Sequence, residues 1–422
     1  MSPAAITLVI LVIAVILFVT EKLPMGIIAF LATMALYFTG IINAKAAFAQ
    51  LANSNIVLIC AMCVVGAAFF NTGMAYKTGN LITRIAKTER ALLIGVMLVG
   101  GVMSGFLSNT GTVAVLMPIV IGICTRTGIK PIKLLLPLGM AATIGADLSL
   151  VGSPGNLIAN ATIQEYSKGQ MSFGFFEYSK LGIPLLLGTI AFMAFFGNRL
   201  IPDRDAGEYT NTNKDYSAIP AWKGQLTLAV LVLTIAAMVL EKQIGIPLYI
   251  SACIGAAVLV CAGVISEKEA YASFEMVVVF LLAFMLPMAT ALSTSGASTI
   301  ITDKVLAFTG DKGPYVLMAA LWILTCLMTQ FMSNTATCAV LCPIGVSIAG
   351  QIGADPRAVV LSIFIASSIA VATPLAIPGN AMVMGPAGAK FKDFAYAGIP
   401  IIILCFIISM VLLPFFYPFF PG

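Results

Sequence analysis

Long apolar runs fill most of this 422-residue chain, and short polar clusters interrupt several of them where charged loops are absent. A helix needs about 20 apolar residues to cross a membrane. The runs predict five spans in each half of the chain, the fourth of each set being broken: 4–20, 24–42, 55–70, 132–164 and 181–198, then 224–240, 246–265, 276–292, 358–388 and 397–417. We therefore predict an all-α polytopic membrane protein.

The polar clusters occur twice. Ser108-Asn109-Thr110 returns as Ser333-Asn334-Thr335, and Gly-Asn at 155–156 returns at 379–380. Such repetition indicates one structural unit written twice. Because five spans is an odd number, the second unit must enter the membrane with inverted topology, as in many secondary transporters. The predicted units are a first repeat at 1–205, a cytoplasmic linker at 206–222 and a second repeat at 223–422.

Each Ser-Asn-Thr cluster lies in the middle of an uncharged segment, Ala91 to Thr125 in the first half and Tyr315 to Gly350 in the second. The arms of the first segment are about 15–17 residues, or roughly 22–25 Å of helix, which is short for a bilayer core. We predict a re-entrant hairpin at each cluster. The alternative is two ordinary spans joined by a polar turn.

The fourth span of each unit contains a break, at 148–156 and at 372–380, where proline and glycine stop the helix. Helix ends at this depth leave positive N–H groups and negative carbonyl groups unpaired. The N–H ends would suit an anion, and the carbonyl ends would suit Na⁺. Hydroxyl and amide donors near the breaks would add to the anion site: Asn109, Thr110, Ser149, Asn334, Thr335 and Thr373.

Composition supports a membrane transporter and excludes other classes. Charged residues make up 9% of the chain, against about 25% in soluble domains. Histidine is absent, which removes the usual proton shuttle and the commonest metal ligand. We find no nucleotide-binding loop or catalytic triad, so we expect no enzyme activity, no organic cofactor and no nucleic-acid partner. The nine cysteines are interpreted as small buried residues.

Most of the 22 lysines and arginines fall on the side of the predicted membrane that holds the linker. By the positive-inside rule that side is cytoplasmic, so both termini are predicted outside. We expect an integral protein of the bacterial inner membrane.

The paired Ser-Asn-Thr clusters, each followed by a Pro- and Asn-containing break, resemble the divalent anion:Na⁺ symporter family. The resemblance runs nearly end to end. It implies a homodimer in the lipid membrane that takes up small divalent anions with two or more Na⁺ ions by an elevator-type movement. Succinate, malate and citrate are the expected substrates, with sulfate as a further candidate. Anion exchange at the same site is one alternative, and an anion channel is another.

The resemblance also implies which residues bind. Matching positions place one Na⁺ site at Ser104, Ser108, Asn109 and the carbonyl of Leu148. A second Na⁺ site falls at Thr329, the carbonyl of Met332, Asn334 and the carbonyl of Ala372. The implied substrate contacts are Asn109, Thr110, Ser149, Asn334, Thr335, Thr373 and Pro374.

Asp147 directly precedes the first break, where the second unit has Val371. It lies about 21 Å along the helix from Lys133, and we predict no other charged residue at this depth. A charge there costs at least a few kcal/mol unless it is paired or neutralised. Asp147 is therefore a candidate coupling carboxyl beside the first Na⁺ site. The alternative is a structural carboxyl that braces the break.

Overall fold

The computed structural model describes residues 2–20, 22–79, 88–204, 219–309 and 314–420. All regular elements in these ranges are helices, which confirms the predicted all-α class. Positions 206–218 of the predicted linker lie outside the described residues.

Twelve elements form what we call the frame group, which comprises the first helices of each half: α1 (Pro3–Thr20), α2 (Met25–Phe38), α3 (Ala44–Phe48), η1 (Ala49–Ala52), α4 (Ser54–Asn71), α5 (Met74–Gly79), α12 (Ala221–Val239), α13 (Glu241–Ile244), α14 (Leu248–Cys261), α15 (Glu267–Ala272), α16 (Met276–Thr294) and α17 (Ala297–Thr309).

The remaining elements form the site group, which holds both polar turns and both breaks: α7 (Glu89–Ser104), α8 (Asn109–Thr127), α9 (Ile132–Gly145), η2 (Ala146–Leu148), α10 (Pro154–Tyr166), α11 (Ser179–Phe195), η3 (Gly197–Arg199), α18 (Pro314–Thr329), α19 (Asn334–Gln351), α20 (Pro356–Ser368), α21 (Pro378–Met384) and α22 (Phe391–Phe416).

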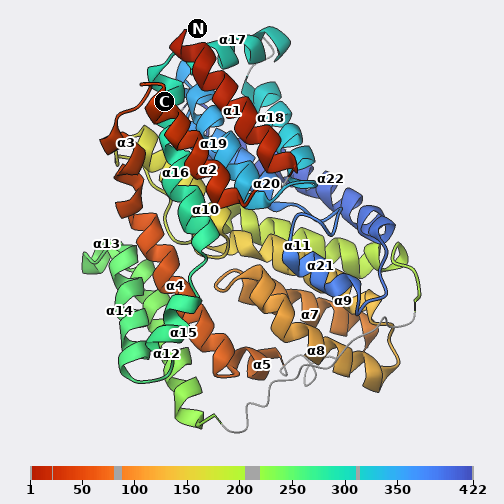
Figure 1. Ribbon diagram of the computed structural model, residues 1–422. Coiled ribbons are helices and arrows are strands. Elements are labelled where there is room, and N and C mark those ends of the chain that lie inside the picture. Colours follow the sequence, from red (N-terminus) through yellow and green to blue (C-terminus); the bar gives the residue numbers. More distant parts are fainter. Residues whose placement is uncertain (1, 21, 80–87, 205–218, 310–313, 421–422) are drawn as a thin grey trace.

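The two halves of the chain interlock within each group. In the frame group, α2 packs on α16, and α4 packs on α12 and α14 (Figure 1). In the site group, α11 lies along α22, α10 packs on α19 and α21 packs on α8. The second part of each broken helix therefore rests on the hairpin of the other half. This crossing places the two breaks at the centre of the site group.

Six helical segments of the described chain are long and apolar enough to cross a membrane. One of them is α8 with 19 residues, longer than the 15–17 residues that the sequence predicted for a hairpin arm. The arm is longer because the helix starts at the polar turn itself. Ser108 caps it by accepting a hydrogen bond from the Gly111 amide at 3.1 Å.

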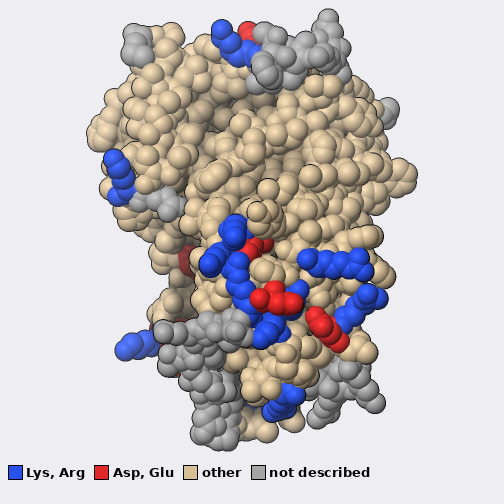
Figure 2. Space-filling model, turned by 90° about the vertical axis from the view of Figure 1, so that its right-hand side faces the viewer, with Lys and Arg blue, Asp and Glu red and all other residues tan. Residues whose placement is uncertain are grey.

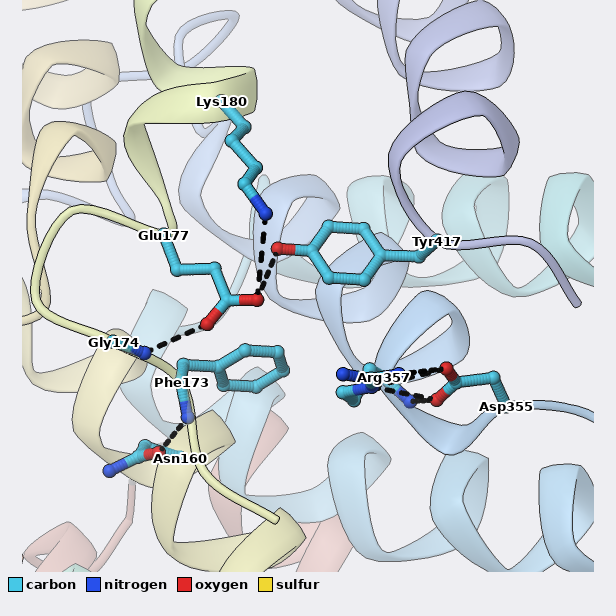
Figure 3. Close-up of polar contacts among 8 residues, drawn as sticks. All are labelled: Asn160, Phe173, Gly174, Glu177, Lys180, Asp355, Arg357 and Tyr417. Carbon is cyan, nitrogen blue, oxygen red and sulfur yellow. Dashed lines mark hydrogen bonds and ion pairs between the residues drawn. The ribbon is translucent and has the colours of Figure 1, made fainter. Parts of the chain in front are cut away.

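One tyrosine ties the two halves of the site group together. The Tyr417 hydroxyl donates to Glu177 Oε1 at 2.8 Å, across the start of α11. The Tyr417 ring centroid lies 5.1 Å from Lys180 Nζ and 5.9 Å from Arg357 Cζ (Figure 3). Arg357, at the start of α20, is itself paired with Asp355 at 2.7 Å. Tyr417 thus connects the first turns of α11 and α20.

One ion pair makes a second tie between the halves, and another holds its segment to α9. Arg204 follows the first half's last helix and pairs with Asp393, in the first turn of α22, at 2.6 Å. Lys133, at the start of α9, pairs with Asp203 at 3.2 Å. Figure 2 shows basic and acidic side chains gathered on the lower part of one face, below a broad uncharged area. Such an uncharged surface suits an apolar surrounding.

Two glycines mark the closest contacts between the long helices and the breaks. A Cβ atom at Gly182 in α11 would lie 2.2 Å from the Asp147 carbonyl oxygen. A Cβ atom at Gly398 in α22 would lie 2.4 Å from the Val371 carbonyl oxygen. Both neighbours are backbone atoms that cannot move aside on their own. Small residues at such crossings allow helices in membranes to approach closely.

We expect Gly182→Ala and Gly398→Ala each to lower the free energy of unfolding by roughly 1–3 kcal/mol, because the added methyl group overpacks the contact. Gly122→Ala in α8 is the control, since its Cβ atom would meet nothing within 4 Å. Thermal unfolding of the purified variants in one detergent measures the effect. Melting temperatures equal to that of the control would contradict the tight crossing.

Candidate functional site

Both Ser-Asn-Thr turns line a single cavity of about 740 Å³. Its wall also includes residues 152–154 of the first break, residues 376–378 of the second and residues 274–278 at the start of α16. Segments that are far apart in the sequence therefore meet around one space. Helices α8 and α19 both begin at this wall, so their N-terminal amides are directed toward the cavity side.

The first turn is folded over the start of α8 by its own side chains. The Asn109 Oδ1 atom accepts from the Thr110 amide at 2.6 Å and from the Thr110 hydroxyl at 3.2 Å. Both residues line the cavity, as does Ser108. The Asn109 Nδ2 group has no partner within the described residues. The first turn thus offers an amide donor to the cavity.

The second turn is anchored to the end of α20. The Asn334 Oδ1 atom accepts from the Thr329 hydroxyl at 3.0 Å, and Asn334 Nδ2 donates to the Ser368 carbonyl at 3.3 Å. The Thr329 hydroxyl also lies 2.6 Å from the Ser367 carbonyl oxygen. Asn334 therefore has protein partners on both ends of its amide, whereas Thr335 lines the cavity without such an anchor.

Each break is bonded to the hairpin of its own half by one hydroxyl group. Ser149 donates to the Gly105 carbonyl, and Thr373 donates to the Gln330 carbonyl at 2.6 Å. Both acceptors lie three residues before the serine of the turn. Neither hydroxyl residue is on the cavity wall, and neither is Pro374. Of the seven substrate contacts expected from the sequence, four line the cavity, and these three are not among its lining residues.

A matched pair of asparagines closes the two breaks. Asn156 Nδ2 donates to the Ala146 carbonyl at 3.1 Å, and Asn380 Nδ2 donates to the Ala370 carbonyl at 3.0 Å. Both side chains are fully buried. In the sequence these asparagines stand out only as markers of the repeat. Their position directly after glycine in both breaks was the signal for a structural role, since an interrupted helix leaves carbonyls that need donors.

The predicted Na⁺ ligands are rich in neutral oxygen atoms, which suit a hard cation. Ser104 is fully buried, and its hydroxyl has no partner within the described residues. The Leu148 carbonyl accepts from the Ser179 hydroxyl. At the second position, the Thr329 hydroxyl lies beside the Ser367 carbonyl and the Asn334 Oδ1 atom, while Asn334 Nδ2 donates to the Ser368 carbonyl. Met332, two residues before Asn334, and Ala372, four residues after Ser368, are both buried.

Asp147 joins the first break to the second half of the site group. Its side chain is 1% exposed, and its Oδ2 atom accepts from the Ser368 hydroxyl at 2.5 Å. Its Oδ1 atom has no partner within the described residues. Ser368 is also the last residue of α20, and its carbonyl holds Asn334. Asp147 is thus two hydrogen bonds away from the second polar turn.

Glu275 is a site residue that the sequence analysis missed. It precedes α16 and lines the 740 Å³ cavity together with both polar turns. It also lines an adjoining cavity of about 180 Å³ between α4 and the first break. Glu275 is exposed to this space, and the partial loss of water around its carboxyl group raises the pKa of that group. Its place at the edge of an apolar run indicated a residue at the membrane surface, and only the packing of α16 on the site group brings it to the cavity.

Comparisons with known proteins identify the family. The model of the citrate transporter family, CitMHS, matches residues 15–247 and 235–421. This chain belongs to the citrate transporter family. The expected resemblance to sodium-coupled anion carriers is confirmed at this level. The six apolar helices then indicate an integral membrane protein.

Relatives cover nearly the whole chain at low identity. The uncharacterized transporter YfbS of Escherichia coli is 20% identical over 97% of this chain and 98% of its own length. The sodium-dependent dicarboxylate transporter SdcS of Staphylococcus saprophyticus is 21% identical over 95% of this chain and 83% of its own. The YdaH transporter of Alcanivorax borkumensis shares the fold, with a TM-score of 0.67 at 15% identity over 98% of both chains.

Proposed function

We propose that this protein is a secondary active transporter that takes up small divalent anions with Na⁺. Succinate, malate and citrate are the proposed substrates, with sulfate as a further candidate. The observation that carries the proposal is the single cavity lined by both Ser-Asn-Thr turns, at the start of α8 and α19. The family and the sodium-dependent dicarboxylate relative support it.

The cavity is suited to anions without a fixed cation. Within the described residues, its lining contains no lysine or arginine. A helix N-terminus carries roughly half a positive charge and several unpaired N–H groups, so two of them provide a site for carboxylates. The Asn109 amide and the hydroxyls of Thr110 and Thr335 add donors at the same wall. Carboxylates of different shape fit such a set.

Na⁺ would supply the remaining positive charge. Ser104, Ser108, Asn109 and the Leu148 carbonyl form the proposed first ion site. Thr329, Asn334 and the Met332 and Ala372 carbonyls form the proposed second one. Because these ligands are neutral, each bound Na⁺ adds a full positive charge next to the anion. The anion and Na⁺ would each bind weakly in the absence of the other. Because each strengthens the binding of the other, their transport would be coupled.

We further propose that the site group moves as one body past the frame group, and that the two polar ties at Tyr417 and Arg204 hold its halves together. In the structure, amide side chains link the two groups between α4 and α10. Asn160 Nδ2 donates to Asn55 Oδ1 at 2.9 Å, and Asn55 Nδ2 donates to Gln164 Oε1 at 2.8 Å. An elevator-type movement has to break these bonds. We place this movement in a membrane-embedded homodimer with both termini outside.

Uptake into proteoliposomes tests the function. We expect saturable accumulation of labelled succinate or citrate when an inward Na⁺ gradient is applied, and little with choline in its place. Asn109→Ala should reduce uptake about tenfold or more, because it removes a donor from the anion and a ligand from Na⁺. Asn43→Ala, at the cap of the frame helix α3, is the control. Counterflow without Na⁺ would indicate an exchanger, and uptake that does not saturate would indicate a channel.

Replacing Asp147 tests its role in coupling. We expect Asp147→Asn to raise the Na⁺ concentration for half-maximal uptake several-fold, with little change in the apparent affinity for the anion at saturating Na⁺. The reason is that Asp147 directly precedes Leu148 of the proposed first ion site, bonds Ser368 next to Asn334 of the proposed second one, and is not among the residues that line the cavity. Ser368→Ala removes the same hydrogen bond and should act in the same direction. Unchanged ion dependence in Asp147→Asn would assign this carboxyl to bracing the break.

Cross-linking tests the movement between the groups. In a variant with the nine cysteines replaced, Asn55→Cys with Asn160→Cys should be joined by a short bis-methanethiosulfonate cross-linker, which forms a disulfide bond with each cysteine. Uptake should then stop, and a reductant should restore it. Glu267→Cys with Tyr271→Cys is the matched control, because these exposed side chains are 2.8 Å apart within α15 of the frame group. Full uptake by the cross-linked Asn55/Asn160 pair would contradict relative movement at this interface.

A further inference from the structure

Glu275 differs in kind from every other residue on the cavity wall. The described lining consists of small, apolar, hydroxyl and amide residues, and Glu275 is the one ionisable side chain among them. Within the described residues its carboxylate has no hydrogen bond or ion pair. An unpaired carboxylate next to two helix N-termini opposes their effect on an anion. This combination is unexpected in a wall built to attract a dianion.

The position of Glu275 in the fold gives it influence over both ion types. It belongs to the frame group, at the start of α16, whereas both polar turns belong to the site group. It also faces the smaller cavity that reaches Ser108 between α4 and the first break. Ser108 is one of the proposed Na⁺ ligands. A carboxylate at the junction of the two spaces therefore acts on the cavity where the anion and Na⁺ are proposed to bind.

The first half of the chain carries no charge at the corresponding helix start. There α4 is capped by Asn53, whose side chain accepts from the Asn55 amide at 2.9 Å and donates to Gln50 Oε1 at 2.8 Å. Glu275 makes no such capping bond with its side chain. The carboxylate is thus not needed to begin the helix, which leaves its charge available to the cavity.

We propose that Glu275 is a selectivity residue of the transport cavity, where its negative charge attracts Na⁺ and repels a divalent anion until Na⁺ has entered. This inference rests on the proposed function and adds a residue that makes anion binding conditional on the cation. A unit charge acts on a dianion across a water-containing cavity with an energy comparable to thermal energy or somewhat larger. The corresponding change in affinity is roughly three- to tenfold.

Binding of labelled citrate and succinate to the purified full-length protein at pH 8 tests the proposal. Na⁺ is varied against choline so that the ionic strength stays constant. We expect Glu275→Gln to bind both anions roughly three- to tenfold more tightly than the wild type when Na⁺ is absent. The variant should also need a several-fold higher Na⁺ concentration for half-maximal stimulation of binding. Glu275→Asp should behave like the wild type.

Two controls separate charge from structure. Asp303→Asn makes the same change of charge at an exposed position on α17 and should leave both measurements unchanged. Raising the salt concentration to about 1 M with choline chloride should remove most of the difference between Glu275→Gln and the wild type, because the screening length falls to about 3 Å. A difference that persists in high salt would show a structural effect and overturn the proposal.

The outcome also separates this proposal from the proposed function. A wild-type protein that binds neither citrate nor succinate in a Na⁺-dependent manner would refute Na⁺-coupled carboxylate transport itself. A Na⁺-dependent wild type with an identical Glu275→Gln variant would refute only the role of Glu275.

Discussion

The structure depends on satisfying the backbone groups of two helices that stop and restart in an apolar environment. An unpaired peptide group away from water costs several kcal/mol, so a break persists only where protein atoms replace the missing hydrogen bonds. Here the replacements come in matched pairs. Ser149 and Thr373 bind hairpin carbonyls, and Asn156 and Asn380 bind carbonyls ten residues back along the chain. The hairpins are held in place by the same bonds that make the breaks possible.

The two breaks are nevertheless completed differently. Gln330 serves the second one, donating to the Ile369 carbonyl at 2.9 Å and accepting from the Ala372 amide at 3.1 Å. The corresponding position in the first hairpin is Gly105, which has no side chain to offer. There the loop before α11 takes over, as the Leu150 amide donates to the Phe175 carbonyl at 2.9 Å. The first break thus gains an additional tie to the loop before α11, and the second gains additional ties to its own hairpin.

Much of this arrangement could be predicted from the sequence, because it rests on local signals. Apolar runs gave the helices, and proline with glycine marked both breaks. The meeting of the two Ser-Asn-Thr clusters followed from treating the halves as copies of one unit. What could not be predicted depends on packing between distant segments. Ser149 and Thr373 donate to backbone carbonyls and are not among the residues that line the cavity. Nothing in the sequence around either residue tells whether its hydroxyl group binds the backbone or faces the cavity.

The two acidic residues Asp147 and Glu275 also show that contacts between distant segments could not be predicted from the sequence. The sequence singled out Asp147 by its depth in an apolar segment, and the structure gives it a partner, Ser368, from the other half of the chain. Glu275 was overlooked because an acid at the end of an apolar run is ordinary at a membrane surface. Its place on the cavity wall follows from the packing of α16 against α10 and α19 of the site group. The position of an acidic residue within an apolar segment therefore predicts that it is buried. Whether an acidic residue faces a cavity depends on how the helices pack.

A cavity lined with helix ends and neutral donors has little charge of its own to set its selectivity. Its preference is therefore sensitive to any full charge placed on its wall. Two helix N-termini contribute about as much positive charge together as one carboxylate cancels. With Glu275 ionised, the wall is close to neutral, and under the proposed function the charge that retains a dianion would have to come from Na⁺ ions that enter with it. The proposed coupling between anion and cation would then follow from the balance of charge in the cavity, without requiring a conformational signal between their sites.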